Sequence, residues 1–431
     1  MQESVSQTAR RGSGHRISQA ITLADGPLTD AFSRLRTSTP YGTFDSSARY
    51  DAGRTTWESI LNGVGANTAF VDNESAVQLN VGTVDGEYAI EQTYRYFTYV
   101  PGKSQLIVMT GLMGAGKTNV VRRMGYFDNE DGLFFEVNGA ALRLVNRTST
   151  SGTPVDNIYE QADWNLDTMD GTESIFNVSG IKLDVSNVQI LVIDFQWLGA
   201  GRVRFGFDIN GRTHYVHEIY NANLVSIVYM KRPNLPCRYE IRNVGVSASP
   251  STLRRLCSSV VNEAGYSLPG YQFSEDSGSA FRTIGTTVTP VFAIRMKQTH
   301  GGILTENRES AQIVQWEMNT DGAGYWQLWV AYNPTTVTGT WADVDTDHSV
   351  VEYSRNISVI SGGAIHKMDS GYITSAGGPT GGVVQVNASI VSQHNFLHRN
   401  YANDGGNIIY LAYAADAVTD DVRGQLAWLE F

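Results

Sequence analysis

The stretch Leu133-Phe-Phe-Glu-Val-Asn-Gly-Ala-Ala-Leu-Arg-Leu-Val145 decides the fold of this chain. Two apolar runs flank Asn138-Gly139, and an Asn-Gly pair in that setting is the strongest short signal for a β-hairpin, because the central residues of a type I′ turn need positive φ. A second hairpin follows, since alternating apolar residues lead into and away from Asn210-Gly211. The central part of the chain is therefore predicted to be antiparallel β-sheet.

A phosphate-loop pattern lies just before the first hairpin and would indicate nucleotide binding. Gly111, Gly116, Lys117 and Thr118 occupy the fixed positions of G-x-x-x-x-G-K-[ST]. Such a loop binds phosphate only where it opens a helix whose first N–H groups face the ligand. The residues after Thr118 predict strands instead of that helix. We therefore interpret the match as accidental and expect no nucleotide and no other cofactor.

A second segment resembles the strand that carries a Mg²⁺-binding carboxylate in nucleotide-binding domains. Ile190-Leu-Val-Ile-Asp194 is apolar and ends in an aspartate. The sequence continues into further strands, whereas a phosphate-loop domain needs crossover helices between parallel strands. The sequence contains no G-x-S-x-G nucleophile motif. Its scattered Asp and Glu residues show no spacing that indicates a catalytic carboxylate pair. The sequence thus predicts no catalytic residues and a protein that is not an enzyme.

The composition fits a large β protein. The 431 residues allow two or three domains, and 43 Gly, 21 Tyr and 8 Trp with only 17% charged residues favour strands and tight turns. The net charge of −11 argues against a nucleic-acid partner, because phosphate backbones require clustered Lys and Arg. The chain has no run long enough to cross a bilayer, and its first residues lack the apolar core of a signal peptide. We expect a soluble protein without a membrane partner.

The predicted organisation is mainly β, with two antiparallel β-sandwiches of jelly-roll type in tandem. One helix is predicted near the domain boundary, where Ser249-Pro250 supplies a start signal and Gly265 a stop. Leu253, Leu256 and Val260 have helical spacing between them. The four predicted segments are an extended arm over 1–50, a first sandwich over 51–248, a helix and linker over 249–287, and a second sandwich over 288–431.

Two groups of residues were candidates for a metal site. His214 and His217 lie on a predicted strand, where residues three apart point to opposite faces, so they do not share one ion. The segment Trp341–His348 carries three alternating aspartates and a histidine, but it lacks the glycine and the terminal glutamate of an EF-hand loop. We interpret the first group as a surface pair and the second as a solvated acidic edge, and predict no metal site.

The N-terminal segment carries a resemblance to a known family. Asp30-Ala-Phe-Ser-Arg-Leu-Arg-Thr-Ser38 with Thr43-Phe-Asp45 closely resembles the D-A-F-x-R-L-R-x-S…F-D-S signature of a family of virion structural proteins carried by tailed phages and some large DNA viruses. The resemblance covers most of the chain. Further matching segments are Pro101–Leu106, Gly125–Asp128, Gly132–Glu136, Ile193–Gly199, Gly201–Gly206, Pro233–Pro236 and Arg238–Ile241.

This resemblance implies a virion component that decorates the capsid or belongs to the tail. We expect a homo-oligomer whose arm binds other virion proteins, because the arm is too poor in apolar residues to form a core of its own. Phe32 and Leu35 are the predicted apolar anchors of the arm, and Arg34 and Arg36 would pair with carboxylates of the partner. The alternative is a receptor-binding adhesin or fibre protein that recognises a host glycan. A phosphate-loop NTPase is a distant third.

Overall fold

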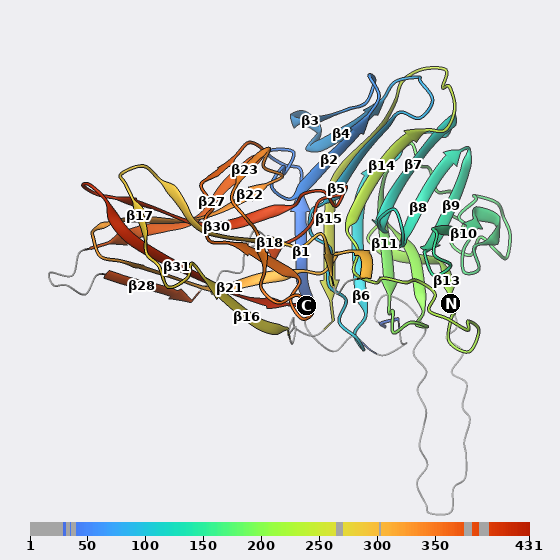
Figure 1. Cartoon of the computed structure of the whole chain (residues 1–431). Helices are drawn as coiled ribbons and strands as arrows, with labels where there is room; N and C mark the ends of the chain where they lie inside the picture. Colours follow the sequence, from blue (N-terminus) through green and yellow to red (C-terminus); the bar gives the residue numbers. More distant parts are fainter. Residues whose placement is uncertain are drawn as a thin grey trace, which may run out of the picture.

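Two β-sandwiches make up the chain in a computed structural model that describes residues 29–31, 35, 40–263, 270–300, 303–374, 382–387 and 396–431. They lie side by side (Figure 1), each built of antiparallel sheets around its own apolar core, which confirms the predicted fold class. Within the described residues, no helix has the length and apolar character needed to span a membrane. Two short 3₁₀ turns are present there, η1 (Asp72–Glu74) and η2 (Gln161–Asp163).

The first sandwich packs an eight-stranded sheet against a seven-stranded sheet. One face of each strand supplies the core, as β6 shows: Ile107 and Met109 are buried inside, while Leu106 and Val108 face outward. In sheet order, the first sheet comprises β13 (Arg212–Ile219), β12 (Val203–Ile209), β11 (Val188–Phe195), β6 (Gln105–Leu112), β15 (Ser251–Asn262), β4 (Ala76–Val81) and β3 (Asn67–Val71), with β1 (Tyr41–Ser47) paired to β15. The second comprises β10 (Val155–Glu160), β9 (Ala141–Thr148), β8 (Gly132–Gly139), β7 (Lys117–Phe127), β14 (Cys237–Asn243), β5 (Tyr88–Thr93) and β2 (Trp57–Asn62).

The second sandwich packs two six-stranded sheets around Trp316, Trp326 and Trp428. One sheet comprises β16 (Tyr271–Asp276), β31 (Asp420–Glu430), β21 (Ala311–Thr320) and β28 (Gly382–Asn387), with β17 (Arg282–Ile284) on β31 and β29 (Phe396–Leu397) on β21. The other comprises β24 (Ala342–Asp343), β25 (Val351–Ser354), β18 (Thr289–Met296), β30 (Asn407–Ala415), β22 (Gly324–Tyr332) and β27 (Ala364–Ile373). Two small hairpins accompany them, β19 (Thr299–His300) with β20 (Ile303–Glu306), and β23 (Thr336–Thr338) with β26 (Val359–Ser361).

The predicted helix near the domain boundary is wrong. The segment forms β15, a twelve-residue strand inside the larger sheet of the first sandwich. Up to Arg255, every second side chain of β15 points into the core. A β-bulge between Arg255 and Ser258 then shifts by one residue which side chains point inward. The shift brings Leu253 and Val260 to the same face of the sheet, whereas Leu256 lies in the bulge outside the core, so the helical spacing of the three is accidental. Proline and glycine at the ends fit a strand equally well.

The two Asn-Gly hairpins differ in their turns. At β12–β13, Ile209 pairs with Arg212, and both Asn210 (φ 55°) and Gly211 (φ 73°) have positive φ, as the predicted type I′ turn requires. At β8–β9, Asn138 pairs with Ala141, so Gly139 (φ 59°) is the first central residue of a turn displaced by one position. Positive φ at the first central position is the pattern of a type II′ turn.

The phosphate-loop pattern lies at the turn between β6 and β7. Gly111 belongs to β6, and Lys117 is the first residue of β7, an eleven-residue strand. The Lys117 ammonium donates hydrogen bonds to the Ser249 hydroxyl (2.7 Å) and the Pro250 carbonyl (3.1 Å). The lysine therefore joins two neighbouring turns of the first sandwich.

The start of the described chain rests on the outer face of the eight-stranded sheet. Thr29, Asp30 and Ala31 are buried there. Arg204 donates a hydrogen bond to the Thr29 carbonyl (2.7 Å), and Arg202 donates one to the Ala31 carbonyl (3.0 Å). This part of the predicted arm is thus bound by its own sandwich. Tyr41–Ser47, also within the segment 1–50, forms β1 of the same sandwich.

Candidate functional site

A polar cleft of about 670 Å³ lies on the outer face of the sheet that contains β18 and β30 in the second sandwich. Ile294 and Met296 of β18 point into the core, so Arg295 points to the opposite face, where the cleft opens. Its other walls come from β24, β25 and the start of β30, and from two loops that contain Asn333 and the segment His398–Asn407.

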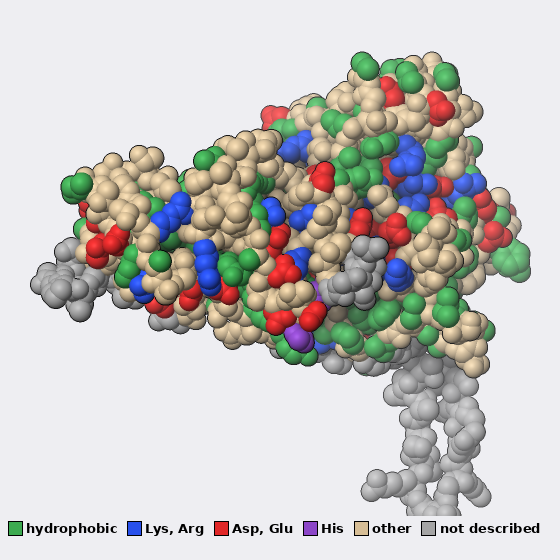
Figure 2. Space-filling view, viewed as in Figure 1, with side chains coloured by type: hydrophobic (Ala, Val, Ile, Leu, Met, Phe, Trp, Pro, Cys, Tyr) green, Lys and Arg blue, Asp and Glu red, His purple; other side chains and the backbone are tan. Residues whose placement is uncertain are grey.

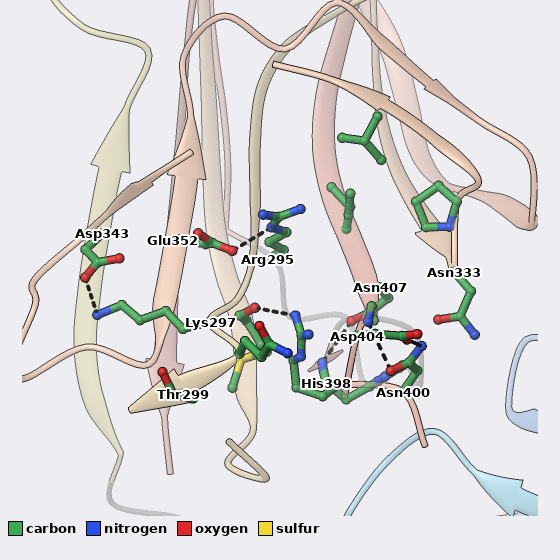
Figure 3. A pocket seen from close by; sticks show the side chains of 18 residues that line it. Arg295, Lys297, Thr299, Asn333, Asp343, Glu352, His398, Asn400, Asp404 and Asn407 are labelled. Atoms are coloured by element: carbon green, nitrogen blue, oxygen red, sulfur yellow. Dashed lines mark hydrogen bonds and ion pairs between the residues drawn. The ribbon is translucent and has the colours of Figure 1, made fainter. Parts of the chain in front are cut away.

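One side of the cleft carries two ion pairs (Figure 3). Arg295 Nε lies 2.6 Å from Glu352 Oε1, and Lys297 Nζ lies 3.3 Å from Asp343 Oδ2. The Arg295 guanidinium also stacks 4.0 Å above the ring of Trp341. Because each long side chain is held by a second group, this wall is fixed before a ligand binds.

The other side of the cleft carries amides and a third carboxylate (Figure 3). Asn400 Nδ2 donates a hydrogen bond to Asp404 Oδ1 (2.7 Å), and the Gly405 N–H donates one to Asn400 Oδ1 (3.1 Å). Asp404 is exposed, and Asn333 projects from the neighbouring loop. This side therefore presents oxygen acceptors and N–H donors close together.

Arg399 holds the segment His398–Asn407 against the sheet. It donates hydrogen bonds to the Met296 carbonyl (3.1 Å) and the Asn403 carbonyl (2.6 Å). Burial, with the nearby charge of Arg295, lowers the pKa of Arg399 to about 10, so the guanidinium stays charged at neutral pH. The Arg399 side chain thus ties the segment to β18 and closes its turn, and the side chains of Asn400 and Asp404 line the cleft.

The charges of the cleft balance. The lining includes three cationic and three acidic side chains, apart from His398. Each acidic group already has a cation or an amide donor beside it. The site therefore offers many neutralised donors and acceptors and no excess of either sign, which suits an uncharged ligand rich in hydroxyl groups. The six charged side chains are Arg295, Lys297, Arg399, Asp343, Glu352 and Asp404.

The residues singled out from the sequence as metal candidates are spread over three environments. Asp343 lines the cleft, whereas Asp345 Oδ1 accepts hydrogen bonds from the backbone N–H groups of Asp347 and His348 (both 2.9 Å) in a local turn. His217 is buried, and its Nδ1 accepts the Asn165 N–H (3.2 Å); burial lowers the pKa of this imidazole to about 4. Among the described residues, no group of three or more His, Cys, Asp or Glu side chains is arranged to hold a metal ion.

Sequence reasoning missed most of the cleft. The contributing residues are spread from 295 to 407, and only Asp343 had been singled out. The available signal was the segment His398-Arg-Asn-Tyr-Ala-Asn-Asp-Gly-Gly-Asn407, in which three asparagines, an aspartate and two glycines indicate a turn rich in amide groups.

The predicted assembly residues lie mostly outside the described residues. This holds for Phe32, Arg34 and Arg36. Leu35 is 51% exposed and its backbone pairs with Thr29 in an isolated β-bridge. Leu35 is therefore not buried in the core of its own sandwich.

A second charged surface, the charge row, crosses the outer face of the seven-stranded sheet in the first sandwich. Neighbouring strands place Glu160, Arg143, Glu136, Arg123 and Glu240 in register, with N–O distances of 2.8, 3.3, 2.7 and 3.0 Å along the row. Acidic and basic side chains lie next to each other over this part of the molecule (Figure 2).

The charge row is internally neutralised. Burial alone would raise the pKa of Glu240, but the charges of Arg238, Arg123 and Arg242 outweigh burial and lower it to about 2. Arg123 lies between Glu136 and Glu240 and contacts both. Because the buried members already pair with one another, the row is a structural network more than a binding site.

A third feature, the apolar groove, lies on the outer face of the eight-stranded sheet. Its volume is about 450 Å³, and it is lined mainly by aliphatic side chains of β6, β11 and β15. Its polar lining residues are Asp208, Thr213, Tyr215, Asn262 and Glu263, of which Thr213 donates a hydrogen bond to Asp208 (3.3 Å) and Tyr215 donates one to Asp194 (3.1 Å). The aliphatic lining residues are Leu106, Val108, Ile190, Val192 and Val261.

Comparison with known proteins finds similarity in structure alone. No family model matches the chain, and no curated protein matches it. Solved structures do match. A legume lectin-like domain from Entamoeba histolytica matches with a TM-score of 0.28 and 10% identity, over 48% of this chain and 89% of that chain. A family 16 glycosyl hydrolase from Mycobacterium smegmatis matches with a TM-score of 0.32 and 10% identity, over 51% of this chain and 100% of that chain. Alginate lyase A1-II′ of polysaccharide lyase family 7 matches with TM-score 0.29, 10% identity, and 49% and 96% coverage.

At TM-scores of 0.28 to 0.32 these similarities add nothing to the β-sandwich fold, which rests on the sheet order and the two apolar cores. The prediction that the protein is not an enzyme has to be corrected, because glycosyl hydrolases and alginate lyases are among the proteins with a similar fold. At these identities and TM-scores, no activity of those proteins passes to this chain.

Proposed function

We propose that this protein is a component of a virus particle that binds carbohydrate through the cleft of its second sandwich. The cleft carries the carbohydrate part of the proposal. A resemblance in sequence to virion structural proteins of tailed phages supports the viral part, and it extends over most of the chain.

The observation that supports carbohydrate binding is the composition of the cleft. A sugar hydroxyl both donates and accepts, so it is best satisfied where acceptors and donors alternate at short distance. The Arg295–Glu352 pair on one side and the Asn400–Asp404 pair on the other provide this arrangement. The volume of about 670 Å³ lies in the range of small-molecule sites and fits a short oligosaccharide.

The balance of charge favours neutral sugars over phosphates and other anions. A phosphate site needs unpaired cations or a helix N-terminus. In the cleft, the Arg295 guanidinium and the Lys297 ammonium are each paired with a carboxylate. An anionic ligand would have to displace those carboxylates, whereas a neutral saccharide hydrogen-bonds to the pairs as they stand.

A glycan array probed with the full chain tests the carbohydrate proposal. We expect binding to a small set of neutral glycans, and we expect Asp404→Ala to remove most of it, because Asp404 is exposed at the rim of the cleft. Lys117→Ala, on the first sandwich, is the matched control and should bind as the wild type does. Absence of glycan binding, or equal binding by the Asp404→Ala variant, would contradict the proposal.

Particle assembly through the N-terminal arm is the second part of the proposal. The double variant Phe32→Ala with Leu35→Ala removes the two predicted apolar anchors of the arm and keeps the contact of Thr29 with Arg204 and strand β1. The variant should remain soluble and β-rich but fail to join particles or to form its homo-oligomer. If it is incorporated as the wild-type chain is, attachment has to involve a face of a sandwich.

A further inference from the structure

The loop His398–Asn407, which forms one side of the cleft, rests on the first sandwich. The Tyr401 ring lies 5.4 Å from the guanidinium carbon of Arg238, and its hydroxyl donates a hydrogen bond to Asn129 Oδ1 (3.3 Å). The His398 ring stacks on Tyr94, with 5.2 Å between ring centroids and an interplanar angle of 18°. Tyr94 directly follows β5 of the first sandwich in the chain, but its side chain packs in the core of the second sandwich. The two sandwiches are therefore joined at the wall of the cleft.

One carboxylate of the first sandwich holds both loops of the cleft. Glu58 Oε2 accepts a hydrogen bond from the Tyr401 N–H (2.9 Å), and Glu58 Oε1 accepts one from Asn333 Nδ2 (3.1 Å). Tyr401 is the neighbour of Asn400, and Asn333 lines the cleft directly. The loops also meet directly, because the Asn333 N–H donates a hydrogen bond to the Gly406 carbonyl (3.2 Å), and Glu58 braces this contact from the first sandwich.

The sequence places Glu58 where it can make these contacts. Trp57 points into the core of the first sandwich, so the next side chain on β2 points to the opposite face. β2 is the last strand of its sheet, beside β5. The edge position leaves room for the two loops of the second sandwich to approach from the side.

We propose that Glu58 is a positioning residue for the cleft, so that the first sandwich determines the shape of the binding site in the second. That the ligand of this binding site is a carbohydrate rests on the proposed function. The two hydrogen bonds and the loops they connect are independent of the identity of that ligand. Glu58 lies outside the cleft lining and acts through Asn333 and the segment that contains Asn400.

The charges around Glu58 give the contact a pH dependence. Burial raises the pKa of Glu58 above its usual value of 4.5, against the lowering effects of the Tyr401 and Asn333 hydrogen bonds and of Arg308; Asp404 raises it further. Release of the loops would expose the carboxylate, so its pKa is higher when the loops are docked. Protonation therefore favours docking, and docking weakens as pH rises from 4.5 through the raised pKa.

Three variants of the full chain test this role. Glu58→Ala removes both acceptors. Glu58→Gln keeps the shape and one acceptor oxygen without the charge, and its NH₂ group can donate to Asn333 once the Asn333 amide turns its oxygen toward it. Glu74→Ala is the matched control, because Glu74 pairs with Arg254 inside the first sandwich. The readouts are the affinity for the glycan that binds best on the array, measured from pH 4.5 to 8, and hydrogen exchange of the Tyr401 amide.

Glu58→Ala should weaken binding by about tenfold or more, as expected for losing hydrogen bonds to a charged acceptor, and should speed exchange at Tyr401. Glu58→Gln should keep binding within about threefold and lose the pH dependence. Glu74→Ala should change neither readout. Unchanged affinity together with unchanged Tyr401 exchange in Glu58→Ala would overturn the inference.

The two proposals fail in different ways. If the wild-type chain binds no glycan, the carbohydrate proposal is wrong, and Tyr401 exchange alone decides whether Glu58 positions the loop. If Glu58→Ala does not fold, the pH profile of Glu58→Gln decides. A Glu58→Gln profile that follows the wild type would refute the role of this carboxylate.

Discussion

The charge row of the first sandwich and the cleft of the second use the same residue types with different results. In the charge row, strand register places each interior side chain between two partners of opposite charge, as Arg123 lies between Glu136 and Glu240. In the cleft, Arg295 and Glu352 are likewise a cross-strand pair, but they face a loop that carries Asn400 and Asp404, and about 670 Å³ lies between the two sides. Register satisfies charged groups internally, whereas loops that meet across a gap leave hydrogen-bonding capacity for a ligand.

The carboxylates of the charge row and of the cleft also differ in how deeply they are buried. The side chain of Glu240 is 1% exposed, whereas Asp404 is exposed at the rim of the cleft. Removing a carboxylate from the charge row should therefore reduce stability, and removing one from the cleft should reduce binding. The predictions below test this division, from the largest expected effect to the smallest.

The largest effect is expected for Glu240→Ala. Arg238 is as buried as Glu240, and its Nη2 lies 2.6 Å from Glu240 Oε2, so the variant leaves a buried guanidinium without its counter-charge. Removing one partner of a buried ion pair costs about 3–5 kcal/mol. Urea unfolding should show this loss, while Asp404→Ala should stay within about 0.5 kcal/mol of wild type. Equal stability of the two variants would abolish the distinction between the two regions.

Acid should weaken the charge row in a defined range. The pKa of Glu240 is lowered from 4.5 to about 2 in the folded protein, so its contribution to stability is complete above pH 4.5 and is lost as pH falls toward 2. Stability measured from pH 6 down to pH 2 should fall through this range. Glu240→Gln should have a flatter profile, and a profile parallel to wild type would show that Glu240 is not the group that titrates.

A smaller effect is expected at the β12–β13 turn. Gly211 has φ 73° with open space around it, so Gly211→Ala costs only the backbone conformation, about 1 kcal/mol. Gly285→Ala is the control, because Gly285 lies outside the positive-φ region and a Cβ there meets only one atom at 3.8 Å. Thermal unfolding should separate the two variants. A neutral Gly211→Ala would argue against the type I′ turn.

The smallest effect is expected for Lys117→Ala. Lys117 is half-buried, and its ammonium hydrogen-bonds to groups at the turn of Ser249 and Pro250, so its removal should change stability by less than about 0.5 kcal/mol. We expect no nucleotide binding by either protein. ATP hydrolysis that disappears in the variant would reverse the interpretation of the phosphate-loop pattern.

The sequence was informative where the pattern is local. Alternation and Asn-Gly turns predicted the two sandwiches, because side-chain period and turn chemistry act within a few residues. β15 was mistaken for a helix because one bulge, between Arg255 and Ser258, broke the alternation. The cleft was not predicted, because Arg295, Glu352 and Asp404 are brought together only by sheet pairing between distant segments.

The contact between the sandwiches was equally hidden. Glu58 and Tyr401 are 343 positions apart, and no periodicity in either segment indicates that they meet. In the sequence, Glu58 has no feature that distinguishes it from an ordinary exposed glutamate on an edge strand. Only the packing of the two sandwiches shows that its carboxylate holds two loops.

An experimental structure of the chain with its best array glycan tests the central claim most directly. We predict that the saccharide lies between the Arg295–Glu352 pair and the Asn400–Asp404 pair, with its hydroxyls hydrogen-bonded to both. The loops held by Glu58 should keep their positions. A saccharide bound on the charge row or in the apolar groove, with the cleft empty, would contradict the account.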